Sequence, residues 1–234
     1  MEKHILTTTP RELGDVVTAW LKLNAQNLDK LYCWPFPPSN PFGFELKPYE
    51  TLAERNRRLR RFLSTLWHQG NNTKRGEIVK WYVGVWGGIN ANKPEKISAY
   101  ATLSDSDLQK LRSGIASWSK VLAVRNPNQF AIYDSWVALS LNIIQLREAH
   151  KLIAYFPMPP WRHLKDESGL RERAQKVIKT HPSFATAEKL PMSRAYGRYL
   201  SALKTGTPPD SSIEQCEMVL FASGEQLALS LLRS

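Results

Sequence analysis

Cysteine is scarce in this chain, and long hydrophobic runs are missing from it. The two cysteines, Cys33 and Cys216, lie far apart and outside any CxxC pattern. They cannot hold an iron–sulfur cluster on their own, and we predict neither a metal site nor a cofactor. No apolar run reaches the roughly 18 residues that a membrane span needs. The first residues are polar and do not resemble a secretory signal, so we expect a reducing, cytoplasmic setting.

Internal repeats and strand-like alternation are also lacking, whereas helical periodicity recurs along the 234 residues. We therefore predict a mainly α protein. Helices are expected at 10–34, 50–69, 104–125, 135–146, 168–181 and 192–204, and from a capping box at 211–214 through Leu231. Loops are expected at the proline-rich stretches 35–48 and 157–161, and a polar turn is expected at 71–76. Residues 78–86 fit either a buried helix or a strand.

The length suits one globular unit, 1–234, that can be divided into two helical subdomains. One subdomain would comprise residues 50–156, and the other would comprise 1–49 together with 157–234. We expect the protein to be a monomer.

Positive charge is in excess and unevenly spread, with a net charge of +11. Residues 51–100 hold ten basic and three acidic side chains, and residues 151–204 hold eleven and four. The stretch between these blocks, 101–150, is nearly neutral, with five basic and four acidic side chains. This pattern favours phosphate binding on either side of a less polar pocket, and so a nucleic-acid partner. The alternative is a basic surface with no partner.

Arginines gather on the predicted helix 50–69, whose apolar face would be buried. The residues expected to be exposed are Arg55, Arg57, Arg58, Arg60 and Arg61. The planar donor fork of arginine can bind two phosphate oxygens, so we predict phosphate contacts for Arg55, Arg58 and Arg61. A solvated helix face is the alternative.

Three aromatic residues are candidates for a base pocket: Trp86, Trp118 and Phe221. Trp86 precedes Gly87 and Gly88, and paired glycines let a backbone approach a ligand closely while the aromatic ring stacks on a base. In the alternative interpretation, Gly87 and Gly88 only form a turn and the tryptophans belong to the core.

The most specific chemical suggestion comes from residues 119–135. Lys120 lies near the end of one predicted helix, an Asn126-Pro127 turn follows, and Asp134 opens the next helix. A neutral lysine amine can attack the anomeric carbon of deoxyribose, and an aspartate can stabilise the positive charge that develops there. A helix N-terminus keeps such an aspartate ionised. The alternatives are an ordinary N-cap and a surface lysine.

This segment resembles the active-site segment of helix-hairpin-helix DNA glycosylases, and most of all the 8-oxoguanine DNA glycosylase branch. The resemblance covers roughly residues 105–146. It implies a helical glycosylase-like fold with the active-site cleft between two helical subdomains. It also implies a Schiff-base nucleophile at Lys120, a charge-stabilising and proton-handling carboxylate at Asp134, and a flipped nucleotide in the pocket.

The chain departs from that family at the turn before the lysine. A Gly-x-Gly hairpin that binds a phosphate is expected there, but this sequence has only Gly114 nearby and a bulky Trp118. We therefore assign phosphate contacts to Ser117, Ser119 and Arg125, to helix N-termini and to the arginines of the 50–69 helix.

The sequence thus predicts a DNA glycosylase, with or without AP lyase activity, acting in base excision repair or in defence against modified DNA. One alternative is a nucleic-acid-binding protein of the same fold that lacks the chemistry. Another is a helical protein-interaction module whose basic face meets an acidic partner. The target base is not identified by any spacing in the sequence.

Overall fold

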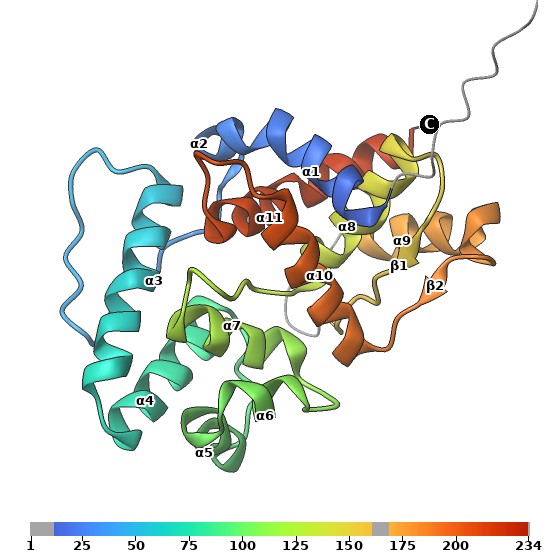
Figure 1. Ribbon diagram of the computed structural model, residues 1–234. Helices are drawn as coiled ribbons and strands as arrows, with labels where there is room; N and C mark the ends of the chain where they lie inside the picture. Colours follow the sequence, from blue (N-terminus) through green and yellow to red (C-terminus); the bar gives the residue numbers. More distant parts are fainter. Residues whose placement is uncertain (1–11, 161–168, 234) are drawn as a thin grey trace, which may run out of the picture.

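The computed structural model describes residues 12–160 and 169–233. This part of the chain is mainly helical, as predicted (Figure 1). Its α-helices are α1 (Leu13–Asn24), α2 (Leu28–Leu31), α3 (Leu52–Gln69), α4 (Asn72–Val79), α5 (Pro94–Thr102), α6 (Asp105–Gln109), α7 (Ile115–Arg125), α8 (Ser135–Glu148), α9 (Leu170–Thr180), α10 (Met192–Gly206) and α11 (Ile213–Leu231). Short 3-10 turns cover Ala25–Asn27 and Pro182–Phe184, and a π-helix covers Lys80–Trp86.

Two-residue strands form the only sheet within the described residues. Strand β1 (Ala154–Tyr155) pairs in parallel with β2 (Glu188–Lys189), and Ala154 lies opposite Glu188. The pair ties the chain after α8 to the chain before α10.

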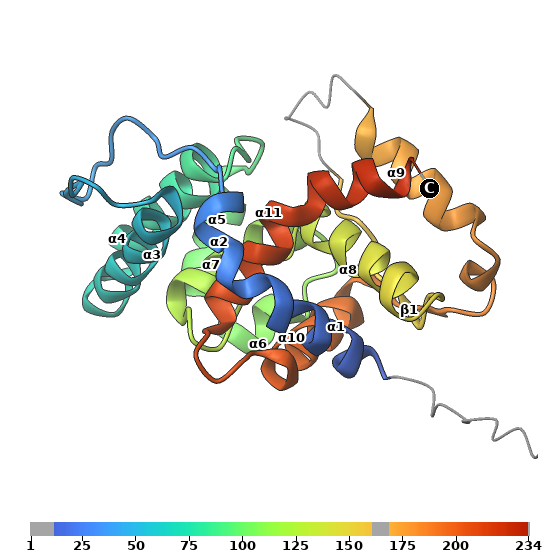
Figure 2. The same ribbon diagram turned by 90° about the horizontal axis from the view of Figure 1, so that it is seen from above.

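Helix α8 is the centre of the structure. Every residue from Val137 to Gln145 is buried. This agrees with a sequence that is apolar on nearly all sides of the helix. Helices α1, α9 and α11 pack around it. Viewed from above, α11 lies between the α3–α4 side of the molecule and α9 (Figure 2). The subdomain expected at 50–156 grouped α8 with α3–α7, whereas in the structure α8 packs chiefly on α11 and α1.

Several predicted elements have different bounds in the structure. Residues 72–76 belong to helix α4 and not to a turn, because the Asn71 side chain accepts a hydrogen bond from Lys74 N–H and caps that helix. The ambiguous stretch 78–86 is helical: its first two residues end α4 and the rest form the π-helix. The helix expected over 104–125 is broken at residues 110–114, so that α6 and α7 are separate. The capping box of α11 pairs Ser212 with Gln215, one residue later than predicted.

The helix expected over 10–34 is interrupted within the described residues: α1 ends at Asn24, a 3-10 turn covers Ala25–Asn27, and α2 ends at Leu31. Other expected elements are present. The stretch 35–48 contains no helix or strand, and the helices near 50–69, 170–180 and 192–206 are present. The first residues of the helix expected at 10–34, and Trp161 and position 168, lie outside the described residues. No helix in the described ranges is both long and apolar enough to cross a membrane.

A buried ion pair joins α3 to α11. Arg60 is 1% exposed, so the prediction that it is exposed on α3 is wrong. Its Nη1 pairs with Glu217, its Nε donates to the Tyr82 hydroxyl at 3.2 Å, and Glu214 lies 3.5 Å away. Burial by itself lowers the pKa of Arg60, but Glu217, Tyr82 and Glu214 together hold that pKa well above its ordinary value. The guanidinium therefore remains charged inside the protein.

Replacing Arg60 tests the role of this pair. We expect Arg60→Met to lower the free energy of unfolding by about 3–5 kcal/mol, because it leaves Glu217 buried without its cation. Urea unfolding followed by tryptophan fluorescence measures the change. The control is Arg194→Met, which removes the exposed pair with Glu188 and should cost less than about 1 kcal/mol. Equal losses in the two variants would contradict a structural role for Arg60.

Candidate active site

A cavity of about 570 Å³ brings together the two residues singled out by the sequence. Lys120 and Asp134 both line it. Its other walls come from the segment after α2, the end of the π-helix, the N-terminal ends of α7 and α8, and the helices α9 and α11. A volume of this size is typical of ligand sites, which span about 300–1,000 Å³.

Lys120 projects from α7 and is 6% exposed. Its Nζ donates a hydrogen bond to the carbonyl of Ala116, one turn earlier in the helix, at 3.1 Å. Burial lowers the pKa of the Lys120 amine, while the negative charges of Asp134 and Glu217 act to raise it. The net shift is downward, so this amine loses its proton more readily than a surface lysine does.

Asp134 is the N-cap of α8, as predicted. Its Oδ1 accepts a hydrogen bond from Val137 N–H at 3.0 Å, and the side chain is partly exposed to the cavity. The carboxylate thus lies beside the free N–H groups and the positive end of the dipole at the start of α8.

The chain between the two residues is held by hydrogen bonds to side chains. Residues 130–133 are buried but belong to no helix or strand. Tyr133 N–H donates to Ser119 Oγ at 3.0 Å, and the hydroxyls of Tyr196 and Tyr199 donate to the carbonyls of Ala131 and Ile132 at 3.0 and 3.1 Å. These bonds pair three buried backbone groups of the segment and help to fix the return of the chain from α7 to Asp134.

Aromatic rings form one wall of the cavity. Trp86 and Phe221 line it, in the positions predicted for a base pocket. Trp34, which sequence reasoning missed, lies between them: its ring is 5.5 Å from Phe221 and 6.1 Å from Trp86, centroid to centroid. Trp34 Nε1 also donates to the Trp86 carbonyl at 3.1 Å. The Pro-rich loop after Trp34 gave no signal that this tryptophan faces a site.

Two predicted site residues lie in the core and not at the cavity surface. Trp118 is 1% exposed and packs edge-on against Tyr196, so its predicted place in the base pocket is wrong. Ser119 is fully buried on Tyr133, and its hydroxyl cannot reach a phosphate. Ser117, by contrast, lines the cavity and accepts a hydrogen bond from Asn92 Nδ2 at 3.1 Å.

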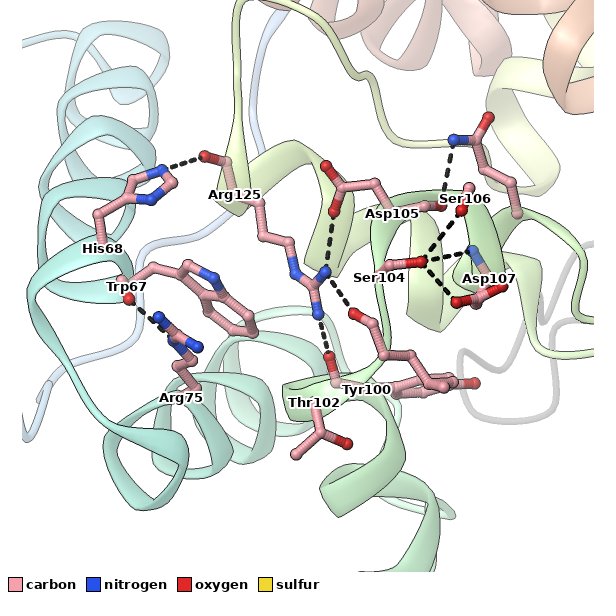
Figure 3. Close-up of polar contacts among 12 residues, drawn as sticks. Trp67, His68, Arg75, Tyr100, Thr102, Ser104, Asp105, Ser106, Asp107 and Arg125 are labelled. Atoms are coloured by element: carbon pink, nitrogen blue, oxygen red, sulfur yellow. Dashed lines mark hydrogen bonds and ion pairs between the residues drawn. The ribbon is translucent and has the colours of Figure 1, made fainter.

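Arg125 also has a structural role instead of the predicted phosphate contact. Its guanidinium donates to the carbonyls of Tyr100 and Leu103 at 2.6 and 2.7 Å and pairs with Asp105 at 2.8 Å (Figure 3). The same group lies over the Trp67 ring, 4.6 Å from its centroid. Arg125 thereby holds α5 and α6 on α7, and it is buried by these contacts.

The arginines of α3 are mostly engaged by neighbouring side chains. Arg58 bonds Glu50 at 2.7 Å and lies over the Phe44 ring, and Arg55 lies over Phe36. Both rings belong to the loop that runs beside α3 (Figure 1). Arg61 is different, because its side chain is 55% exposed. Its contact with an acidic group is the one between Nη2 and a carboxylate oxygen of Glu214, which are 3.6 Å apart. Of the three predicted phosphate ligands on α3, Arg61 is the one most open to solvent.

The cavity is also lined by charged residues that the sequence did not single out. Lys96, Arg112 and Arg171 add positive charge, and Glu217 adds a second carboxylate beside Asp134. Arg171 Nη1 bonds Ser135 Oγ at 3.0 Å and lies over the Trp136 ring. Burial raises the pKa of Glu217, and the nearby Arg60 opposes that shift. These residues come from α5, the turn before α7, α9 and α11, so their convergence leaves no mark in local spacing.

A hairpin of two helices is present at the cavity edge although the Gly-x-Gly sequence is absent. The turn 110–114 joins α6 to α7 and ends at Gly114, whose φ of 78° is left-handed. A Cβ on Gly114 would lie 2.6 Å from the Tyr100 hydroxyl and 2.7 Å from Lys96 Nζ. Both the backbone conformation and the close packing therefore require glycine here.

Comparisons with protein-family models, curated proteins and solved structures find no match to this chain.

The charge environment of Lys120 yields a signed prediction. We expect Asp134→Asn to lower the pKa of the Lys120 amine further, because it removes a negative charge that acts to raise that pKa. Asparagine is also a good N-cap, so α8 should remain intact. Competitive labelling with trace acetic anhydride across a pH series, read on the Lys120 peptide by mass spectrometry, measures the pKa. An unchanged or higher pKa in Asp134→Asn would contradict the proximity of the two groups.

Proposed function

We propose that this protein is a DNA glycosylase that excises a damaged or modified base. The observation that carries the proposal is that Lys120 and Asp134 line one cavity beside an aromatic wall. The lysine has a lowered pKa, and the aspartate sits at a helix N-terminus. Such a pair matches what N-glycosidic bond cleavage requires: a nucleophile that can be neutral and a fixed negative charge.

In this mechanism the Lys120 amine leaves its bond to the Ala116 carbonyl and attacks C1′ of the deoxyribose. The bond from C1′ to the base breaks, and the base departs with the bonding electrons and takes up a proton. Asp134 stabilises the positive charge that develops on the sugar and receives a proton from the attacking amine. Opening of the sugar ring then gives a Schiff base at Lys120, from which β-elimination cleaves the strand.

The cavity walls support binding of a flipped nucleotide. Trp34, Trp86 and Phe221 offer aromatic faces and edges on which an extruded base can stack. The volume of about 570 Å³ is large enough for a base with its sugar.

Positive charge at the cavity edge supports docking of the DNA backbone. Arg112 is exposed and Lys96 partly exposed, and both lie beside the N-terminus of α7. Helix N-termini bind phosphates through free N–H groups and the helix dipole. We propose that the hairpin formed by α6 and α7 binds the phosphate next to the flipped nucleotide. Arg61 would bind a more distant phosphate.

Borohydride trapping tests the proposal. Duplexes that each carry one modified base or an abasic site are incubated with protein and sodium borohydride, which reduces a Schiff base to a stable covalent adduct. Wild type should give a protein–DNA adduct with at least one duplex, and Lys120→Ala should give none. Asp134→Asn should reduce base release at least about 100-fold, in the range of a lost acid–base or charge-stabilising group.

Lys204→Ala is the matched control, because Lys204 is an exposed lysine on α10 away from the cavity lining. It should trap as wild type does. If no duplex in the panel gives an adduct or a released base, the glycosylase proposal fails. DNA binding that is salt-sensitive and unaffected by Lys120→Ala would then identify the non-catalytic nucleic-acid-binding alternative.

A further inference from the structure

We propose that Gly87 is a positioning residue for Lys120: its bare α-carbon forms the surface against which the lysine side chain is held. The steric contact stands on the structure alone, and its catalytic consequence rests on the proposed function.

The space around Gly87 is filled by the lysine. A Cβ on this residue would lie 2.7 Å from Lys120 Cε and 2.9 Å from Lys120 Cδ. Carbon atoms in contact are normally about 3.5–4.0 Å apart, so no other residue fits without displacing something. The same Cβ would lie 2.8 Å from the Val83 carbonyl oxygen. Gly87 has φ −88°, so the requirement for glycine here comes from close approach and not from backbone conformation.

The backbone at Gly87 is fixed from several sides. Gly87 N–H donates to the Tyr82 carbonyl at 2.9 Å, which closes the π-helix, and Ile89 N–H donates to Val83 at 3.0 Å. The Trp86 carbonyl, in the same peptide unit as Gly87 N–H, accepts the bond from Trp34 Nε1. The Trp86 ring is held by its own bond to Asn56 Oδ1 at 2.6 Å. The backbone therefore cannot retreat easily, and the flexible end of Lys120 is the part that must move.

This contact limits where the amine can go. A lysine side chain loses much rotamer freedom when it is confined, and a reacting group gains from being held in place before the reaction. Gly87 closes one side of the Lys120 stem, while the bond to the Ala116 carbonyl directs the amine along α7 toward the cavity. A side chain at position 87 would push Cδ and Cε away from this path.

A double-mutant cycle tests the contact without DNA. Gly87→Ala should lower the melting temperature, and the same change made in Lys120→Ala should lower it by a smaller amount. The reason is that the new methyl group enters the space left by Cδ and Cε, so that only its contact with the Val83 carbonyl oxygen remains. The control is Gly76→Ala in α4, because a Cβ on Gly76 meets nothing within 4 Å. Gly76→Ala should have the same effect in both backgrounds.

If Gly87→Ala alone does not fold, the double variant should resist unfolding better than Gly87→Ala does, since it removes the clash with the lysine and leaves only the contact with the Val83 carbonyl oxygen. Equal destabilisation by Gly87→Ala in both backgrounds would overturn the proposal, as would a double variant that is no more resistant to unfolding than Gly87→Ala alone.

A second measurement reports on the position of the amine in folded Gly87→Ala. Competitive acetic anhydride labelling should show a Lys120 pKa closer to its ordinary value, because displacement from the contact exposes the amine to water. Borohydride trapping should slow at least about tenfold, since small misplacements of a reacting group are costly. An unchanged Lys120 pKa in the folded variant would overturn the proposal. If the cycle shows coupling while wild type traps no duplex, the positioning role stands and the glycosylase function fails.

Discussion

The structure of the site depends on how a stretch of irregular backbone is buried. Residues 130–133 cross the interior between α7 and α8 without the hydrogen bonds of a helix or sheet. Their polar groups are paired instead with Ser119 and with the hydroxyls of Tyr196 and Tyr199 on α10. Unpaired buried N–H and carbonyl groups are costly, so these bonds specify one path for the chain. That path brings Asp134 to the cavity that Lys120 also lines.

Buried charge is the second constraint, and it is balanced across elements. Arg60 on α3 pairs with Glu217 on α11, and Glu217 also faces the cavity that holds Lys120. The lysine thus sits among two carboxylates and a guanidinium, all of which influence its pKa. Burial remains the largest influence and lowers that pKa. The same burial that stabilises the fold therefore lets this amine lose its proton more readily.

The sequence was sufficient to predict the helical class, the helix that becomes α8 and the cap at Asp134. These features depend on local spacing and on residue type at a helix end. The break between α6 and α7 was missed because the apolar stripe continues through residues 108–122 although Gly114 takes a left-handed conformation. The spacing of apolar residues does not reveal the backbone conformation of a glycine that lies among them.

The arginines show why the site could be predicted only in part. Helical spacing indicates which residues share a face, but not what packs on that face. Arg60 is buried because Glu217 lies 157 positions away in sequence and adjacent in space. Arg58 and Arg55 are covered by rings from the loop before α3. The aromatic wall could not be predicted for the same reason, since Trp34, Trp86 and Phe221 are far apart in the sequence and meet only after the chain has folded.

The bond from Trp34 to the Trp86 carbonyl has a consequence for how ligand binding and folding are linked. The cavity wall joins the segment after α2 with the π-helix and with α11, so no continuous stretch of the chain can form it alone. A molecule bound there contacts parts that separate when the protein unfolds, and it stabilises the folded state by mass action. Affinity for such a ligand is thereby coupled to the cooperativity of the whole helical assembly. The pocket therefore depends on the complete fold, and no single segment of the chain can form it.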